Sequence, residues 1–187
     1  MRIVVTGFEP FDGREKNASW EAVRALQGVE RTLLPVSFAR AAERVRAIAA
    51  SRPDAVICVG EAGGRKAVSV ERTAINLMDA RIPDCDGAQP RDAAISEGGP
   101  AAYFSTLPTR RILNAVSGAG IPAEMSYTAG TYVCNCVFYA LMESARAHQV
   151  KAAGFIHVPA WDADADRLRQ ALAIAVRCTE QWLTETR

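Results

Sequence analysis

The sequence lacks the features that mark several large classes of protein. No stretch of about 18 apolar residues occurs, so we expect no transmembrane helix. Lysine and arginine total 22 against 21 for aspartate and glutamate, which leaves a net charge of +1 and no basic excess for nucleic acid or an anionic membrane. The opening residues 1–7 read as a strand entering a turn, so we expect no secretory signal. Neither a nucleic acid nor a membrane is therefore an expected partner.

Patterns that bind nucleotides or metal ions are also missing. The glycine-containing turns at residues 7–11 and 60–65 do not match the Gly-x-Gly-x-x-Gly fingerprint of dinucleotide sites. Cys134, Cys136 and His157 suggest zinc, but residues two apart on a helix point about 200° away from each other. Three acids in one loop lack the regular spacing of a calcium loop: Asp79, Asp84 and Asp86. We expect no metal and no cofactor.

Cysteine is sparse and unevenly placed. The chain has five cysteines, an odd number without the spacing of a disulfide framework, which favours a reducing cytoplasm. Cys58 lies in an apolar strand pattern and Cys178 on an apolar helix face, so both read as inert core thiols. Cys85 lies in a loop with no base nearby in sequence.

Short apolar runs alternate with helical patterns along the chain. The runs occupy residues 3–5, 32–36, 55–59, 125–128 and 152–158. This alternation predicts an α/β fold with a mostly parallel twisted sheet covered by helices. With 187 residues and 49% hydrophobic content, one domain over residues 1–187 is expected.

Two helices are especially clear. The first carries an apolar stripe, follows a capping residue, Ser37, and ends before Pro53; the stripe consists of Phe38, Ala41, Ala42, Val45, Ile48 and Ala49. The final helix opens with acids that suit the positive end of its dipole: Asp162, Asp164 and Asp166. We expect it to pack on the sheet through Leu168, Leu172, Val176 and Leu183.

The stretch from Tyr127 to Asn135, followed by an apolar run with a histidine, offers a nucleophile and a base. An Ala-Gly turn and then apolar residues at helical spacing place Cys134 in the first turn of a helix, where the dipole favours a thiolate. His157 stands where its apolar strand ends at Pro159. Since strand carboxyl ends and helix amino ends meet at the ligand crevice of an open α/β sheet, Cys134 and His157 are candidates for a catalytic pair. The plainer interpretation is a core thiol and a structural histidine.

Glu71 is the candidate third member of such a site. It lies in an alternating, strand-like segment and would orient the imidazole by accepting a hydrogen bond from its far nitrogen. Most glutamates in such patterns face solvent, and Arg72 beside it offers an ordinary surface ion pair.

A pocket is expected near the same end of the sheet. Phe8 and Phe11 flank a proline in the turn after the first strand, while residues 60–65 form a glycine-rich turn that permits close backbone approach. Core packing is the alternative for both phenylalanines.

Seven motifs together resemble one family. They are Gly7-Phe-Glu-Pro-Phe11, Asn17-Ala-Ser-Trp20, Gly63-Gly-Arg65, Glu71-Arg-x-Ala-Ile-Asn76, Asp79-Ala-Arg-Ile-Pro-Asp84, Gly99-Pro-Ala-Ala-Tyr-Phe-Ser105 and Thr128-Ala-Gly-Thr-Tyr-Val-Cys-Asn135. This set closely resembles the pyroglutamyl peptidase I (pyrrolidone-carboxylate peptidase) family. The resemblance implies an α/β/α sandwich, a homo-oligomer, and a cytoplasmic cysteine exopeptidase that acts on peptides with an N-terminal pyroglutamate.

The resemblance also implies a role for each matching residue. Cys134 would be the nucleophile, His157 the base and Glu71 the third member. The remaining positions would bind substrate: Phe8 and Phe11 hold the lactam ring, Asn17 lies near the pocket, Ile82 adds to the wall, and Arg81 supports the oxyanion together with the Cys134 backbone N–H.

The sequence departs from the family pattern at Asp12, where we expect glycine, at Cys136, often a histidine, and at Glu61, where glutamine is common. A carboxylate at position 61 can accept a hydrogen bond from a lactam N–H but cannot donate one to its carbonyl. Glu61 motivates one alternative, a related cysteine amidase for another lactam or cyclic imide. A separate alternative is a noncatalytic binder of modified peptide ends.

Overall fold

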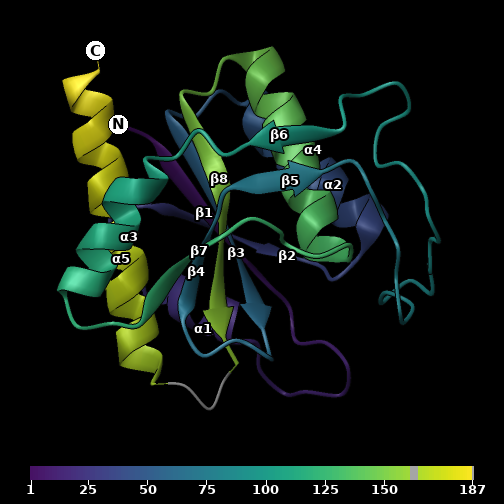
Figure 1. Cartoon of the computed structure of the whole chain (residues 1–187), viewed down its shortest axis with the longest axis horizontal. Helices are drawn as coiled ribbons and strands as arrows, with labels where there is room; N and C mark the ends of the chain where they lie inside the picture. The colour runs from purple at the N-terminus through teal and green to yellow at the C-terminus, as the bar shows by residue number, and fades with distance from the viewer. Residues whose placement is uncertain (161–163, 187) are drawn as a thin grey trace.

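The computed structural model describes residues 1–160 and 164–186, and a central sheet runs through them (Figure 1). Its six strands lie in the order β2 (Glu30–Leu34), β1 (Ile3–Phe8), β3 (Ala55–Ala62), β8 (Ala152–Pro159), β4 (Val68–Glu71) and β7 (Ala123–Ser126). Neighbouring strands are parallel except for β4 and β8, which pair antiparallel. The predicted mostly parallel sheet is confirmed.

The strands form because their residues suit burial on both faces. Every residue of β1 and β8, and most of β3, is buried, as expected for near-continuous apolar runs in the centre of a parallel sheet. The edge strand β2 begins two residues earlier than its apolar run predicts and ends at Leu34, because Pro35 has no N–H for the ladder. Strand β7, the other edge, is likewise shifted by two residues from the predicted 125–128.

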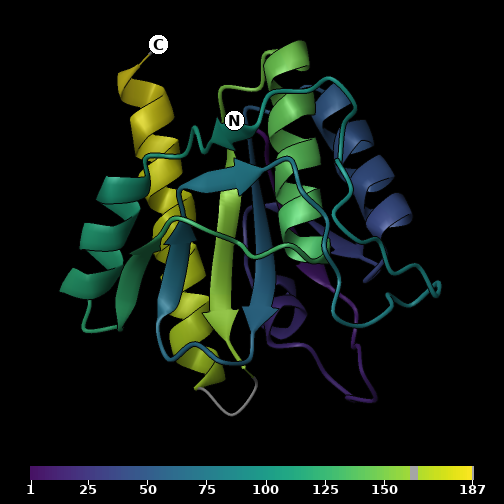
Figure 2. The same cartoon turned by 45° about the vertical axis from the view of Figure 1, so that its right-hand side comes forward.

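Helices cover both faces of the sheet, so the α/β/α sandwich is confirmed (Figure 2). Helices α1 (Ala18–Arg24), α3 (Thr109–Gly118) and α5 (Ala165–Glu185) pack on one face. Helices α2 (Phe38–Ala50) and α4 (Val133–His148) pack together on the other. The two layers enclose separate apolar cores, one on each side of the sheet.

The two helices that the sequence defined most clearly behave as predicted. The Ser37 side chain caps α2 by accepting from the Arg40 N–H, 3.1 Å away. Nearly all of the apolar stripe of α2 is buried. In α5 the Asp164 side chain caps the first turn, and the four apolar residues expected to face the sheet are buried. Asp162, the first acid expected at this start, lies outside the described residues.

A small second sheet was not anticipated as a separate element. Strands β5 (Thr73–Ile75) and β6 (Ala102–Phe104) pair antiparallel and contact α4. The segment that reads as one strand in the sequence therefore divides at Arg72, where β4 leaves the central sheet and β5 crosses toward α4. This division leaves Glu71 as the last residue of β4, beside the central strand β8.

Candidate active site

Cys134 is the second residue of α4, which confirms its predicted position in the first turn of a helix. Its thiol lies against the sheet above Gly60 of β3. A methyl group at Gly60 would lie 2.9 Å from Cys134 Sγ and 2.8 Å from the Phe155 ring, both closer than atoms normally pack. The absence of a side chain at position 60 is therefore what makes room for the sulfur.

His157 lies on the neighbouring strand and faces the same layer as the thiol. In the register of β3 with β8, His157 pairs with Gly60, the residue beneath Cys134. Adjacent strands are about 4.8 Å apart, so the imidazole starts one strand away from the sulfur. The His157 side chain is 5% exposed, and its ring packs 4.8 Å from the ring of Phe155.

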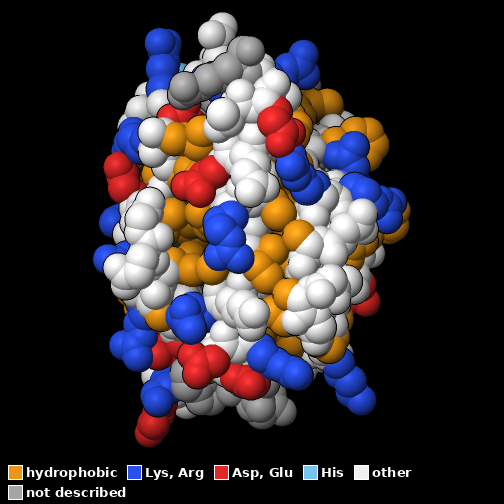
Figure 3. Space-filling model, turned by 90° about the vertical axis from the view of Figure 1, so that its left-hand side faces the viewer, with side chains coloured by type: hydrophobic (Ala, Val, Ile, Leu, Met, Phe, Trp, Pro, Cys, Tyr) orange, Lys and Arg blue, Asp and Glu red, His pale blue; other side chains and the backbone are white. Residues whose placement is uncertain are grey.

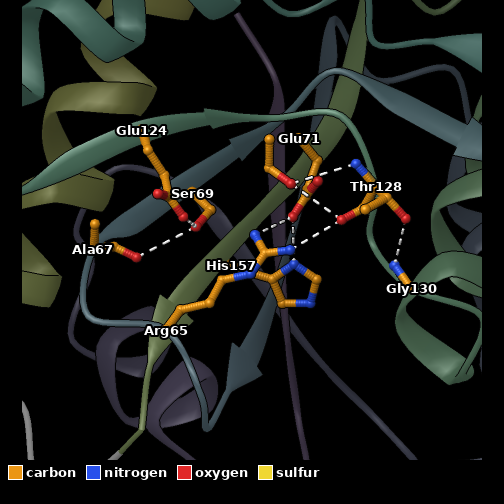
Figure 4. A network of polar contacts seen from close by, with 9 residues as sticks. Arg65, Ala67, Ser69, Glu71, Glu124, Thr128, Gly130 and His157 are labelled. Carbon is orange, nitrogen blue, oxygen red and sulfur yellow. Dashed lines mark hydrogen bonds and ion pairs between the residues drawn. The ribbon is translucent and has the colours of Figure 1, made fainter.

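Glu71 orients this histidine. Its Oε1 lies 2.7 Å from His157 Nδ1, and its side chain is fully buried (Figure 4). This position excludes the alternative of a solvent-facing glutamate. With the proton on Nδ1, the imidazole donates to Glu71, and the unprotonated Nε2 points away from the carboxylate as an available base.

Arg65 is the residue that sequence reasoning missed. Its Nη1 lies 2.6 Å from the same Oε1 of Glu71, and its Nη2 donates to the Thr128 carbonyl at 2.9 Å. Arg72, considered as a partner of Glu71, instead donates to the Ser105 carbonyl at 2.7 Å and lies 4.8 Å above the Phe104 ring. The Gly63-Gly64-Arg65 motif carried the resemblance, but nothing in its spacing pointed toward Glu71.

Electrostatics at the thiol differ from the expectation based on the helix dipole. The pKa of Cys134 is raised to about 12, chiefly by burial; the negative charge of Glu71 also raises this pKa, and Arg65 lowers it. Desolvation of the sulfur, which the sequence does not reveal, is the largest cause of the rise. Nucleophilic attack at neutral pH therefore requires a base to accept the thiol proton.

Cys134 opens into a pocket of about 240 Å³. The predicted residues that line it are Phe8, Phe11, Asn17, Glu61 and Ile82. Unpredicted members include Val36 and Tyr132, whose ring packs against Phe11 and Phe38. Arg81 is exposed and is not among the described residues that line this pocket. Two larger surface grooves, of about 670 and 520 Å³, are lined by other segments and do not include Cys134.

Two predicted polar residues of the pocket wall, Asn17 and Glu61, already have partners. Asn17 caps α1, because its Oδ1 accepts from the Ser19 N–H at 3.0 Å. Glu61 accepts from the Ala18 N–H at 2.7 Å through one oxygen and pairs with Arg14 through the other. The charge at position 61 is thus balanced by Arg14, a residue that the sequence did not single out.

The candidate metal ligands do not form one site. Cys136 Sγ points toward α2, 3.7 Å from the Phe38 carbonyl, while Cys134 points toward the sheet. Asp84 accepts from three backbone N–H groups, and Asp79 and Asp86 pair with arginines. Across residues 1–160 and 164–186, no group of histidine, cysteine and acidic side chains could hold a metal ion.

No helix within those ranges is long and apolar enough to cross a membrane.

Known proteins resemble this chain over most of its length. The family model described as pyroglutamyl peptidase matches residues 1–169. A pyrrolidone-carboxylate peptidase from Thermococcus kodakarensis is 43% identical over 98% of both chains, and pyrrolidone-carboxylate peptidase 1 from Ralstonia nicotianae is 49% identical over 84% of this chain and 77% of that relative.

Solved structures agree with these sequence matches. The crystal structure of Bacillus amyloliquefaciens pyroglutamyl peptidase I superposes with a TM-score of 0.91 at 42% identity, covering 95% of this chain and 96% of the other. Pyrrolidone carboxyl peptidase from Thermococcus litoralis gives a TM-score of 0.92 at 34% identity, covering 100% of this chain and 96% of the other. Because sequence and fold match together across nearly the whole length, the chain belongs to the pyroglutamyl peptidase family.

Proposed function

We propose that Cys134, His157 and Glu71 hydrolyse the amide bond that links an N-terminal pyroglutamate to the rest of a peptide. The observation that carries this proposal is the buried contact of 2.7 Å between Glu71 and His157. His157 pairs across the sheet with Gly60, and the Cys134 thiol lies directly above Gly60. A nucleophile, a base and a group that orients the base are the parts that acyl transfer needs.

The first half of the reaction forms a thioester. The Cys134 proton moves to Nε2 of His157 as the sulfur attacks the carbonyl carbon of the scissile amide. The resulting oxyanion accepts from the backbone N–H of Cys134, which has no acceptor within the first turn of α4. The imidazolium then gives its proton to the departing peptide amine as the C–N bond breaks. Glu71 stabilises the imidazolium throughout.

The second half releases the product. His157 takes a proton from water, the resulting hydroxide attacks the thioester, and the C–S bond breaks. The proton returns to sulfur, which yields free pyroglutamate and the resting thiol. No cofactor or metal enters either half. Arg81 remains a predicted support of the oxyanion, and the backbone donor does not depend on it.

A small, largely apolar pocket suits a lactam ring. Phe8, Phe11 and Ile82 supply apolar wall at the pocket that opens to Cys134. Pyroglutamate carries no α-ammonium group, so it enters without the desolvation of a charge, whereas a free amino terminus would have to lose its hydration. This difference accounts for selectivity toward the cyclised residue.

The direct test is release of a fluorescent amine from a pyroglutamyl amide by reduced wild-type protein. Cys134→Ala protein is assayed in parallel, and a prolyl amide of the same amine serves as a substrate control with a similar ring and a charged nitrogen. We expect the wild type to cleave only the pyroglutamyl amide and the variant to lose the activity. Equal turnover by the Cys134→Ala protein would exclude the mechanism.

The Glu61–Arg14 ion pair in the pocket wall favours a second candidate substrate class. A related amidase for another lactam or a cyclic imide would use the same thiol, and a panel of lactam analogues with the same leaving amine distinguishes the two. Higher kcat/KM on an analogue than on the pyroglutamyl amide would favour this class. Noncatalytic binding of modified peptide ends would appear as affinity without turnover.

Assembly and compartment remain predictions. The five cysteines are free, which fits the expected cytoplasmic setting. The face formed by α3 and α5 shows apolar side chains interspersed with charged ones (Figure 3). We expect a homo-oligomer, and light scattering on the purified protein at several concentrations measures it.

A further inference from the structure

Arg65 connects the proposed catalytic carboxylate to the loop that carries the nucleophile. It lies just beyond β3, after the glycines of the turn, and its side chain is 25% exposed. One guanidinium nitrogen contacts Glu71 Oε1 and the other donates to the Thr128 carbonyl (Figure 4). Thr128 begins the short segment that leads through Tyr132 into α4 and Cys134.

The charge of Glu71 requires such a partner. Its side chain is fully buried, its Oε1 is shared by His157 and Arg65, and its Oε2 has no hydrogen-bond partner among the residues that the structure describes. Burying a charge is costly unless a group of opposite charge or hydrogen-bond donors lie beside it. Among the contacts of Glu71, Arg65 supplies the permanent positive charge, 2.6 Å from Oε1. Arginine stays protonated at any pH at which the fold survives.

We propose that Arg65 is a positioning residue that balances the charge of Glu71 and fixes this carboxylate relative to the Cys134 loop, so that the Cys134 proton can pass to His157. The proposal rests on the proposed function, since it assigns Arg65 a part in that same site. Arg65 does not touch the reacting atoms. It acts through Glu71 and through the backbone of Thr128.

Charge bookkeeping explains why the guanidinium matters to the thiol. Before proton transfer, the charges of Glu71 and Arg65 cancel, and the thiol and the imidazole are neutral. After transfer, thiolate and imidazolium form a second pair, and the four groups still sum to zero. Without Arg65, the site carries a net negative charge both before and after the transfer, and the thiolate forms near a carboxylate whose charge is not balanced. This uncompensated negative charge disfavours the thiolate.

Other charged groups around the thiol do not replace Arg65. The thiol is faced by Glu71 from β4, His157 from β8, Cys58 and Glu61 from β3, and Arg65 from the following turn. Glu61 is already paired with Arg14. Glu124 of β7 is exposed and accepts from Ser69 at 2.7 Å. Within this set, Arg65 is the cation that lowers the pKa of Cys134.

Alkylation of Cys134 by iodoacetamide as a function of pH tests the charge without using a substrate. Rates are followed by mass spectrometry of the peptide that contains Cys134, with the exposed Cys85 as an internal reference. Removing a cation makes the thiol proton harder to lose, so Arg65→Gln should alkylate about tenfold more slowly than the wild type across the pH range in which the protein stays folded. Arg65→Lys keeps the charge and should alkylate at a rate near that of the wild type.

The lysine variant separates charge from geometry. A single ammonium cannot reproduce the fork that joins Glu71 to Thr128. We therefore expect Arg65→Lys to lower kcat by about tenfold on the pyroglutamyl amide while KM changes little. Arg111→Gln is the matched control, because Arg111 also grips a glutamate, Glu185, but does so between α3 and α5 on the far side of the sheet. That variant should match the wild type in both assays.

Three results would overturn the proposal: an Arg65→Gln alkylation profile that superimposes on the wild type, the same slowing of alkylation in Arg65→Lys, or wild-type kcat in Arg65→Lys. If Arg65→Gln fails to fold, the two lysine results decide alone. Failure of the proposed function is distinguishable, because wild-type protein would then not hydrolyse the pyroglutamyl amide although its alkylation profile could still depend on Arg65.

Discussion

Gly60 lies beneath the Cys134 sulfur and beside the Phe155 ring, so position 60 controls where the nucleophile sits. In Gly60→Ala, the new methyl group would lie within 3.0 Å of both neighbours, and one of them must shift. Displacement of a reacting group by about 1 Å lowers rates by roughly 10²-fold, and we expect a loss of this order in kcat/KM. Gly118→Ala is the control, because a methyl group there meets nothing within 4 Å. Wild-type kcat/KM in Gly60→Ala would show that the sulfur tolerates the shift.

Glu71→Gln removes the negative charge and keeps the shape. The amide cannot stabilise the imidazolium as a carboxylate does, and it leaves Arg65 as an unpaired cation in its place. We expect kcat on the pyroglutamyl amide to fall by about 10²-fold or more, with a near-ultraviolet circular dichroism spectrum that matches the wild type. Glu124→Gln, which retains the contact with Ser69, should keep full activity. If the two variants had the same kcat, Glu71 would have no part in the reaction.

The sequence was sufficient to place the candidate residues whose chemistry is visible in their type and spacing. Cys134 followed a turn and opened a helical pattern, and His157 stood at the end of a buried strand. Arg65 and Arg14 were not found, because each acts through a partner 6 or 47 positions away, and only the folded chain brings the guanidinium to its glutamate. The raised pKa of Cys134 was not predicted for the same reason, since burial is a property of the packed structure.

At the scale of elements, the first turn of α4 is tied to the small sheet by Asn135. This side chain is fully buried; its Oδ1 accepts from the Ile75 N–H, and its Nδ2 donates to the carbonyls of Ile75 and Leu77. Asn135→Ala leaves these groups without partners, and we expect the free energy of unfolding in urea to fall by about 2–3 kcal/mol. In Asn114→Ala, on the exposed side of α3, the change should stay within about 0.5 kcal/mol. Equal stability of the two variants would mean that water satisfies the freed groups.

Long elements were predictable and short ones were not. Helices α2 and α5 and strands β1, β3 and β8 carry enough apolar residues for their period to show in the sequence. Strands β5 and β6 have three residues each, and their pairing depends on long-range contacts with α4 rather than on a pattern of their own. The observed bounds of β2 and β7 differ from the predicted ones because hydrogen bonds between strands, and not hydrophobicity, decide where an edge strand ends.

For the whole molecule, the sheet separates the layer that carries the chemistry from the layer that mainly supplies stability. Cys134 and its helix pack in the core with α2, while α1, α3 and α5 enclose the other core. Leu172 of α5 and Leu141 of α4 are both almost fully buried, one in each layer. Truncation of either to alanine should lower the free energy of unfolding by about 2–5 kcal/mol, because each leaves a cavity.

The two truncations should differ in activity. Leu172→Ala changes contacts on the far side of the sheet, so at a temperature where the protein remains folded its kcat should stay within about twofold of the wild type. Leu141→Ala lets the helix that holds the nucleophile settle toward the sheet, and its kcat should fall by about tenfold or more, since the thiol must stay aligned with His157. Urea denaturation and steady-state hydrolysis on the same samples measure both quantities. Equal losses of kcat at equal losses of stability would show that the two layers act as one unit and that the sheet does not insulate the site.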